Sequence, residues 1–126
     1  GPVLILEDDT VFLPDFYNRT VDIMKRLPAN WDIFHVGYCW EAQCHKLGPK
    51  TKDFCRIRRN VLYCTQAYFI NGSKAASLAL NVLNTEVPRV LDIALYRSTS
   101  NYYASLPKLA KQFYGFGSDI GNPIKE

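Results

Sequence analysis

The chain has 126 residues, enough for one domain with a buried core, and 48% of them are hydrophobic, an ordinary fraction for a globular protein. Its formal net charge of +3 is too small to indicate the basic stripe typical of nucleic-acid-binding surfaces. No apolar run reaches the length of a membrane-spanning helix. We therefore expect a single domain over residues 1–126, whose function depends on particular side chains.

The first predicted element is a strand at residues 3–6, where an uninterrupted run of Val, Leu and Ile predicts burial on both faces. Three carboxylates follow it directly: Glu7, Asp8 and Asp9. Since unpaired buried charge is costly, we expect them at the exit of the strand, where open α/β sheets bind ligands. In an extended segment Glu7 and Asp9 point the same way and could share Mg²⁺ or Mn²⁺. The alternative is a solvated acidic turn.

The next two elements predict a βαβ unit. Pro14 suits the first turn of a helix, and apolar residues at helical spacing continue as far as Leu27. Residues 31–37 then predict a second strand that is buried on both faces, which makes His35 more typical of a structural residue than of a metal ligand. A strand, a helix and a strand in this order favour parallel strands covered by helices.

Residues 38–60 form a long excursion that contains three of the four cysteines and many lysines and arginines. Excursions of this length are functional, stapled or mobile, and this one is either a solvated basic loop or a wall that contacts an anionic substrate or a partner. The cysteines do not have the paired spacing of a structural zinc site, and their three possible disulfide connectivities stay open. They are Cys39, Cys44, Cys55 and Cys64.

Two N-glycosylation sequons begin at Asn18 and Asn71. Together with an even number of clustered cysteines, they favour the oxidising secretory pathway. The alternative is a cytoplasmic protein with four reduced cysteines.

In the second half of the chain, residues 60–70 predict a strand, residues 74–84 a helix and residues 102–106 a last short strand. An irregular tail is expected over residues 107–126. Asp92 stands in an apolar stretch, where an acid is rare unless it is paired or functional. It could instead cap a short helix, and both roles could hold at once.

The order of these segments resembles glycosyltransferase family 25, which includes the lipooligosaccharide galactosyltransferases of bacteria and the procollagen galactosyltransferases of animals. The resemblance spans nearly the whole chain, although no single motif is specific. The segments that carry it are residues 4–9, residues 31–33 with Gly37, residues 65–70, residues 74–76, Pro88 with residues 91–95, and Gln112 with residues 117–120.

The resemblance implies a GT-A-like fold, with a mixed, mainly parallel sheet and flanking helices. It also implies an inverting transferase that moves galactose or glucose from a UDP-sugar to a hydroxyl of a protein or glycan. Glu7 and Asp9 match the residues that hold Mn²⁺ or Mg²⁺, with Asp9 the closer contact, and Glu7, Asp8 and Asp119 would contact the donor. Asp92 would take the proton of the acceptor hydroxyl. The expected location is the lumen of the endoplasmic reticulum or Golgi, or outside the cell.

The catalytic domain of that family has a further N-terminal segment, which begins the nucleotide-binding half of the sheet. The resemblance therefore implies that this chain is the C-terminal portion of such a domain. A non-catalytic GT-A-like binding or structural module is the alternative. A third possibility is a secreted, disulfide-stapled interaction domain whose acids bind Ca²⁺.

Overall fold

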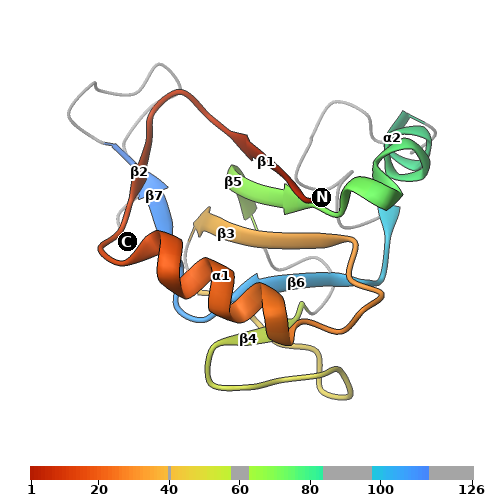
Figure 1. The fold of residues 1–126 in the computed structure, drawn as a ribbon, viewed down its shortest axis with the longest axis horizontal. Coiled ribbons are helices and arrows are strands. Elements are labelled where there is room, and N and C mark those ends of the chain that lie inside the picture. The colour runs from red at the N-terminus through yellow and green to blue at the C-terminus, as the bar shows by residue number, and fades with distance from the viewer. Residues whose placement is uncertain (40, 58–62, 84–97, 114–126) are drawn as a thin grey trace.

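A computed structural model describes residues 1–39, 41–57, 63–83 and 98–113. Within these residues, seven strands form one mixed sheet, accompanied by the helices α1 (Phe16–Arg26) and α2 (Ala75–Leu83) and by the short 3₁₀ turn η1 (Gly72–Lys74) (Figure 1). The strands are β1 (Val3–Leu6), β2 (Thr10–Phe12), β3 (Ile33–Cys39), β4 (Phe54–Arg56), β5 (Tyr63–Ile70), β6 (Tyr102–Ser105) and β7 (Ala110–Gln112).

The sheet is mostly antiparallel, so the expectation of a mainly parallel sheet was wrong. Its main strand order is β1-β5-β3-β6-β4, and β5 runs antiparallel to both β1 and β3. The strands β1 and β3 do run in the same direction, as a βαβ unit requires, but β5 lies between them. Among the strands of the described residues, only the pairs that β3 forms with β6 and β7 are parallel, while β4 pairs with β6 and β2 with β7 in antiparallel fashion.

The strand β1 lies at an edge of the sheet and is not buried on both faces, which corrects the expectation from its apolar run. Val3, Ile5 and Leu6 are 50%, 36% and 44% exposed, and Leu4 alone of its residues packs against a core cluster. A continuous apolar run reports hydrophobicity and not position in the sheet, because edge and central strands share the same local pattern.

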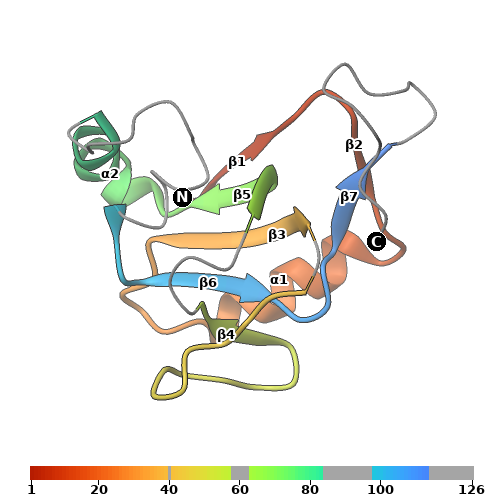
Figure 2. The same cartoon turned by 180° about the vertical axis from the view of Figure 1, so that it is seen from behind.

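The strand β3 is the centre of the domain, and all seven of its residues are buried. Phe34 and Val36 pack with Ile23 of α1, whereas Ile33 packs with Leu78 of α2. Successive side chains point to opposite faces of a strand, so these contacts form two core clusters, one on each face. Figure 2 shows α1 covering one of these faces from behind.

Two nested disulfides, one inside the other in the sequence, fix the excursion that follows β3 to the sheet. Cys39–Cys64 joins the end of β3 to β5, and Cys44–Cys55 holds the excursion onto β4. Two disulfides in a domain of this size indicate an extracellular or secretory-pathway location. In the described part of the chain, no helix is long and apolar enough to cross a membrane.

Most of the predicted elements are found, with shifted ends. The helices predicted after Pro14 and at residues 74–84 correspond to α1 and α2, and the strand predicted at residues 102–106 corresponds to β6. The short strands β2 and β4 were not predicted, and β7 lies in a tail that was expected to be irregular. These three strands have three residues each, too few for a periodic pattern.

Candidate functional site

Glu7, Asp8 and Asp9 form a turn between β1 and β2, here called the acidic turn. The Glu7 N–H donates to the Gln66 carbonyl at 3.0 Å, and the Thr10 N–H donates back to the Glu7 carbonyl at 3.2 Å. The Thr10 hydroxyl donates to the same Glu7 carbonyl at 2.7 Å. The segment is therefore a turn and not extended, so the strand alternation on which the shared direction of Glu7 and Asp9 was predicted does not apply to it. The acids do follow the strand directly, as expected.

Both carboxylate oxygens of Asp9 are held by side-chain amides from other strands. Gln66 of β5 donates to Oδ1 at 2.8 Å, and Gln112 of β7 donates to Oδ2 at 2.8 Å. The Asp9 carbonyl also accepts from the Phe113 N–H at 2.7 Å. Two segments that are far from Asp9 in the sequence, β5 and the end of β7, thus converge on its carboxylate and fix its position.

The two neighbouring acids are driven in opposite directions. Burial by itself would raise the pKa of Asp9, but the hydrogen bonds from Gln66 and Gln112 outweigh it, so that this pKa is lowered. Burial and then the charge of Asp9 raise the pKa of Glu7, although a hydrogen bond from Thr65 at 3.4 Å opposes them. Asp9 is therefore the more firmly ionised of the two.

The negative charge of the acidic turn has no cationic partner among the described residues. The ion pairs found there join Arg26 to Asp22 and Asp53, and Lys74 to Asp32. The three acids of the turn take part in none of these pairs. A carboxylate that is ionised, fixed by neutral donors and free of an ion pair can accept a cation.

The acidic turn follows the carboxyl end of β1, and β1 runs in the same direction as β3 and β6. The carboxyl ends of these three strands thus lie on the same side of the sheet (Figure 1).

A pocket of about 250 Å³ also lies at the carboxyl ends of β3 and β6. Tyr38 closes one of its sides, where its hydroxyl donates to the Ser105 carbonyl at 2.6 Å and Lys108 Nζ lies 5.3 Å from its ring centroid. The residues that line the pocket are Tyr38, Glu41, Ala42, Leu106, Pro107 and Lys108.

Of the predicted site residues, the structure brings Glu7, Asp8 and Asp9 together in one turn. Asp92 and Asp119, predicted for proton transfer and donor contact, lie outside the described residues. Within the described ranges, no group of three or more His, Cys, Asp or Glu side chains is placed to hold a metal ion.

Sequence reasoning did not assign a role to Gln66 or Gln112. Gln66 is 5% exposed and lies beside the buried residues Ala67, Tyr68 and Phe69 of β5, and a buried amide of this kind signals a specific hydrogen-bond partner. Gln112 carries no such signal, because only the pairing of β7 with β2 brings it beside Asp9.

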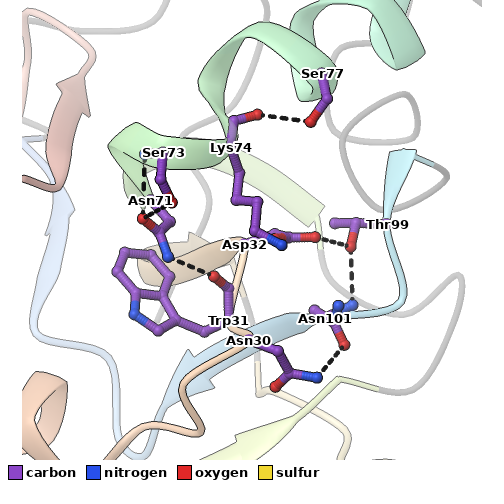
Figure 3. A network of polar contacts seen from close by, with 9 residues as sticks. All are labelled: Asn30, Trp31, Asp32, Asn71, Ser73, Lys74, Ser77, Thr99 and Asn101. Carbon is purple, nitrogen blue, oxygen red and sulfur yellow. Dashed lines mark hydrogen bonds and ion pairs between the residues drawn. The ribbon is translucent and has the colours of Figure 1, made fainter.

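A second polar cluster surrounds Asp32, immediately before the amino end of β3 (Figure 3). Asp32 is 8% exposed, accepts from the Thr99 hydroxyl at 2.5 Å and lies 3.6 Å from Lys74 Nζ. Beside it, Asn71 donates to the Trp31 carbonyl at 3.0 Å. These contacts join the start of β3 to η1 and to the segment that leads into β6, so that the role of this acid is structural.

No family model matches the chain, and neither a curated protein nor a solved structure matches it. Function is therefore inferred from the geometry of the acidic turn and from the residue pattern around it.

Proposed function

We propose that the chain is part of the catalytic domain of a metal-dependent glycosyltransferase of GT-A type, similar to glycosyltransferase family 25. The reaction transfers galactose or glucose from a UDP-sugar to a hydroxyl of a protein or glycan, with inversion. The observation that carries this proposal is the state of Asp9, which is fixed by Gln66 and Gln112 and has no ion pair among the described residues. The ordered motifs of the sequence support it.

The acidic turn fits a divalent cation such as Mn²⁺ or Mg²⁺. Its donors are hard carboxylate oxygens, and each oxygen of Asp9 keeps a lone pair beyond the one that accepts from a glutamine. The raised pKa of Glu7 reflects burial and the nearby charge of Asp9, and a bound cation would offset both. Glu7 and Asp9 would hold the metal, which would neutralise the charge that develops on the departing nucleoside diphosphate.

The other polar side chains of the site are proposed to have separate roles in orienting Asp9, contacting the donor and removing a proton. Gln66 and Gln112 keep Asp9 ionised and oriented. Asp8 is exposed beside it and is proposed to contact the donor, as is Asp119. Asp92 is proposed as the base that takes the proton of the acceptor hydroxyl. The two disulfides fit the proposed location, the lumen of the endoplasmic reticulum or Golgi.

A non-catalytic GT-A-like module is the second candidate, and one observation favours it. Asp9 already accepts two side-chain hydrogen bonds, which suffice to fasten the acidic turn to β5 and β7 without any ligand. In that case the same geometry serves only to hold the sheet together at this edge.

Calorimetric titration with UDP-galactose and UDP-glucose, with and without Mn²⁺, separates the two candidates. The transferase proposal predicts Mn²⁺-dependent binding that weakens at least ~10-fold in Asp9→Asn, since a fixed anionic ligand is lost. Asp22→Asn is the matched control, because Asp22 is an exposed acid of α1 that should not affect binding. Donor binding that Asp9→Asn leaves intact would refute the metal assignment, and no binding of either nucleotide sugar would favour the non-catalytic module.

A further inference from the structure

We propose that the chain carries an N-linked glycan at Asn18 and that the second sequon, at Asn71, stays unmodified. Both sequons are complete in the sequence, Asn18-Arg19-Thr20 and Asn71-Gly72-Ser73. The two disulfides indicate the compartment in which this modification takes place. The proposal rests on this location and on the surroundings of the two asparagines, and not on the proposed transferase activity.

Asn18 lies in the first turn of α1 and is exposed. Its Nδ2 donates to Asp15 Oδ1 at 3.0 Å, a contact between two exposed side chains. Tyr17 beside it is 75% exposed, so that this side of the helix faces solvent. A sugar on Asn18 Nδ2 therefore displaces no core contact and leaves the packing of α1 against β3 unchanged.

The side chain of Thr20 gives an independent reason to assign this sequon. Thr20 is 4% exposed, and its hydroxyl has no hydrogen-bond partner among the described residues. A buried hydroxyl without a partner costs stability, so a valine of nearly the same shape would suit this position of the folded domain better. The hydroxyl is needed, however, for Asn18 to be an acceptor of the glycan.

The burial of Thr20 also sets the order of events. The modifying enzyme must reach the whole sequon, which is possible only before α1 packs onto the sheet. In the reaction, Asn18 Nδ2 forms a bond to the anomeric carbon of a lipid-diphosphate-linked oligosaccharide and gives up one amide proton. The bond from that carbon to the phosphate oxygen breaks, and the lipid diphosphate leaves with the electron pair.

The amide of Asn71 is engaged at both of its ends (Figure 3). Its Oδ1 accepts from the Ser73 N–H at 3.3 Å and from the Ser73 hydroxyl at 3.0 Å, while its Nδ2 donates to the Trp31 carbonyl at 3.0 Å. The chain is crowded here, since a Cβ on the neighbouring Gly72 would lie 2.1 Å from the Gly1 carbonyl oxygen. A chain that received a sugar on Nδ2 before folding could not form the Trp31 contact, so this corner would not fold and the folded protein would carry no sugar at Asn71.

The test uses the full chain, fused to a secretion signal, in eukaryotic cells. Glycosidase treatment that converts a glycosylated asparagine to aspartate, followed by peptide mass spectrometry, identifies the modified residue. We expect the mark at Asn18 alone, its loss in Thr20→Val and its retention in Thr20→Ser and Ser73→Ala. A mark at Asn71, or an unmarked wild-type chain, would overturn the proposal.

Thermal unfolding of Thr20→Val tests whether the buried Thr20 hydroxyl contributes nothing to the stability of the folded domain. The variant is compared with the deglycosylated wild type, so that the sugar itself does not affect the comparison. Because the buried hydroxyl has no partner to lose, the melting temperature should not fall. A marked fall would show that the hydroxyl has a structural role, and the assignment through Thr20 would then be wrong.

Discussion

Asp9 and Asp32 are both held by side-chain hydrogen bonds, but Asp32 lies at the amino end of its strand and Asp9 lies beyond the carboxyl end of a strand that runs in the same direction. Asp32 precedes β3, is almost fully buried and is paired with Lys74, so that its charge is compensated inside the fold. Asp9 follows the carboxyl end of β1, and its partners are the neutral amides of Gln66 and Gln112. Asp32 thus connects segments of the fold through a compensated charge, whereas the charge of Asp9 has no cationic partner among the described residues and is proposed to bind a ligand.

The proposal that Asp9 binds a cation while Asp32 is structural rests on this difference in charge balance. Hydrogen bonds alone do not distinguish them, since both acids accept side-chain donors. What distinguishes them is charge balance, because a buried acid needs a cation to offset its desolvation, whereas a half-exposed acid at a sheet edge does not. Asp9 also lies beyond the carboxyl end of a strand, the position at which open α/β sheets bind ligands.

Low pH should have the largest effect and should abolish the difference between the two clusters, because it destabilises the folded state around β3, the central strand of the sheet that carries both. His35 lies on β3 among the rings of Tyr38, Tyr68 and Tyr102, and burial lowers its pKa to about 4. Since the unfolded chain takes up this proton near pH 6.5, stability should fall as the pH drops through that value towards 4. The expected loss from this group is about 3 kcal/mol in all, of which about 2 kcal/mol is lost by pH 5.

Urea unfolding between pH 7 and pH 5 measures this loss, and His35→Gln serves as the control. The variant has no imidazole to titrate, so the pH dependence in this window should flatten whatever its absolute stability. An equally steep dependence in His35→Gln would assign the acid sensitivity to other groups.

Truncation should sharpen the contrast between the two acids. Asp32→Ala leaves the partly buried Thr99 hydroxyl without its charged acceptor and the half-exposed Lys74 without its ion pair, and we expect a loss of about 2 kcal/mol in the free energy of unfolding. Asp9→Ala should cost only about 1 kcal/mol, since Gln66 Nε2 keeps the Thr10 hydroxyl as an acceptor at 2.7 Å.

Urea unfolding of the two variants at pH 7 gives both values under one condition. Equal losses would mean that Asp9 is as structural as Asp32. That result would favour the non-catalytic reading of the acidic turn.

Removing one amide should cost about as little stability as Asp9→Ala, but it should have a specific effect on the charge of Asp9. Gln66→Met keeps the length of the side chain and deletes the donor, so the pKa of Asp9 should rise and stability should fall by about 1 kcal/mol. A carboxyl ¹³C NMR titration reports this pKa, and Gln112→Met should shift it in the same direction. If Gln66→Met leaves the pKa of Asp9 unchanged, the amide does not hold the carboxylate in its ionised form.

Local patterns predicted the elements better than their arrangement. The helical spacing that ends at Leu27 and the apolar run that contains Ile33 identified α1 and β3, because both depend on near neighbours. The similar run that contains Ile5 was assigned to the interior, although β1 is an exposed edge strand. Edge and centre differ only in long-range pairing, here the entry of β5 between β1 and β3.

The candidate site shows the same limit. The three acids after a strand were evident in the sequence, but their turn geometry was not. The glutamines that hold Asp9 come from positions 57 and 103 residues further along the chain, and no spacing rule connects them. Their meeting depends on the pairing of β7 with β2 and on the bond from Glu7 to β5.

The most direct test of the central claim is a titration with Mn²⁺ alone, followed through the side-chain amide NMR signals of the ¹⁵N-labelled protein. The paramagnetic ion broadens nearby signals, and the chain provides its own control, because the side chains of Gln66 and Gln112 report on Asp9 whereas those of Asn71 and Asn101 report on the Asp32 cluster (Figure 3). We predict early broadening of the two glutamine signals, its loss in Asp9→Asn, and unchanged asparagine signals. Sharp glutamine signals throughout the titration, or equal broadening at both clusters, would contradict the assignment of the acidic turn as the cation site.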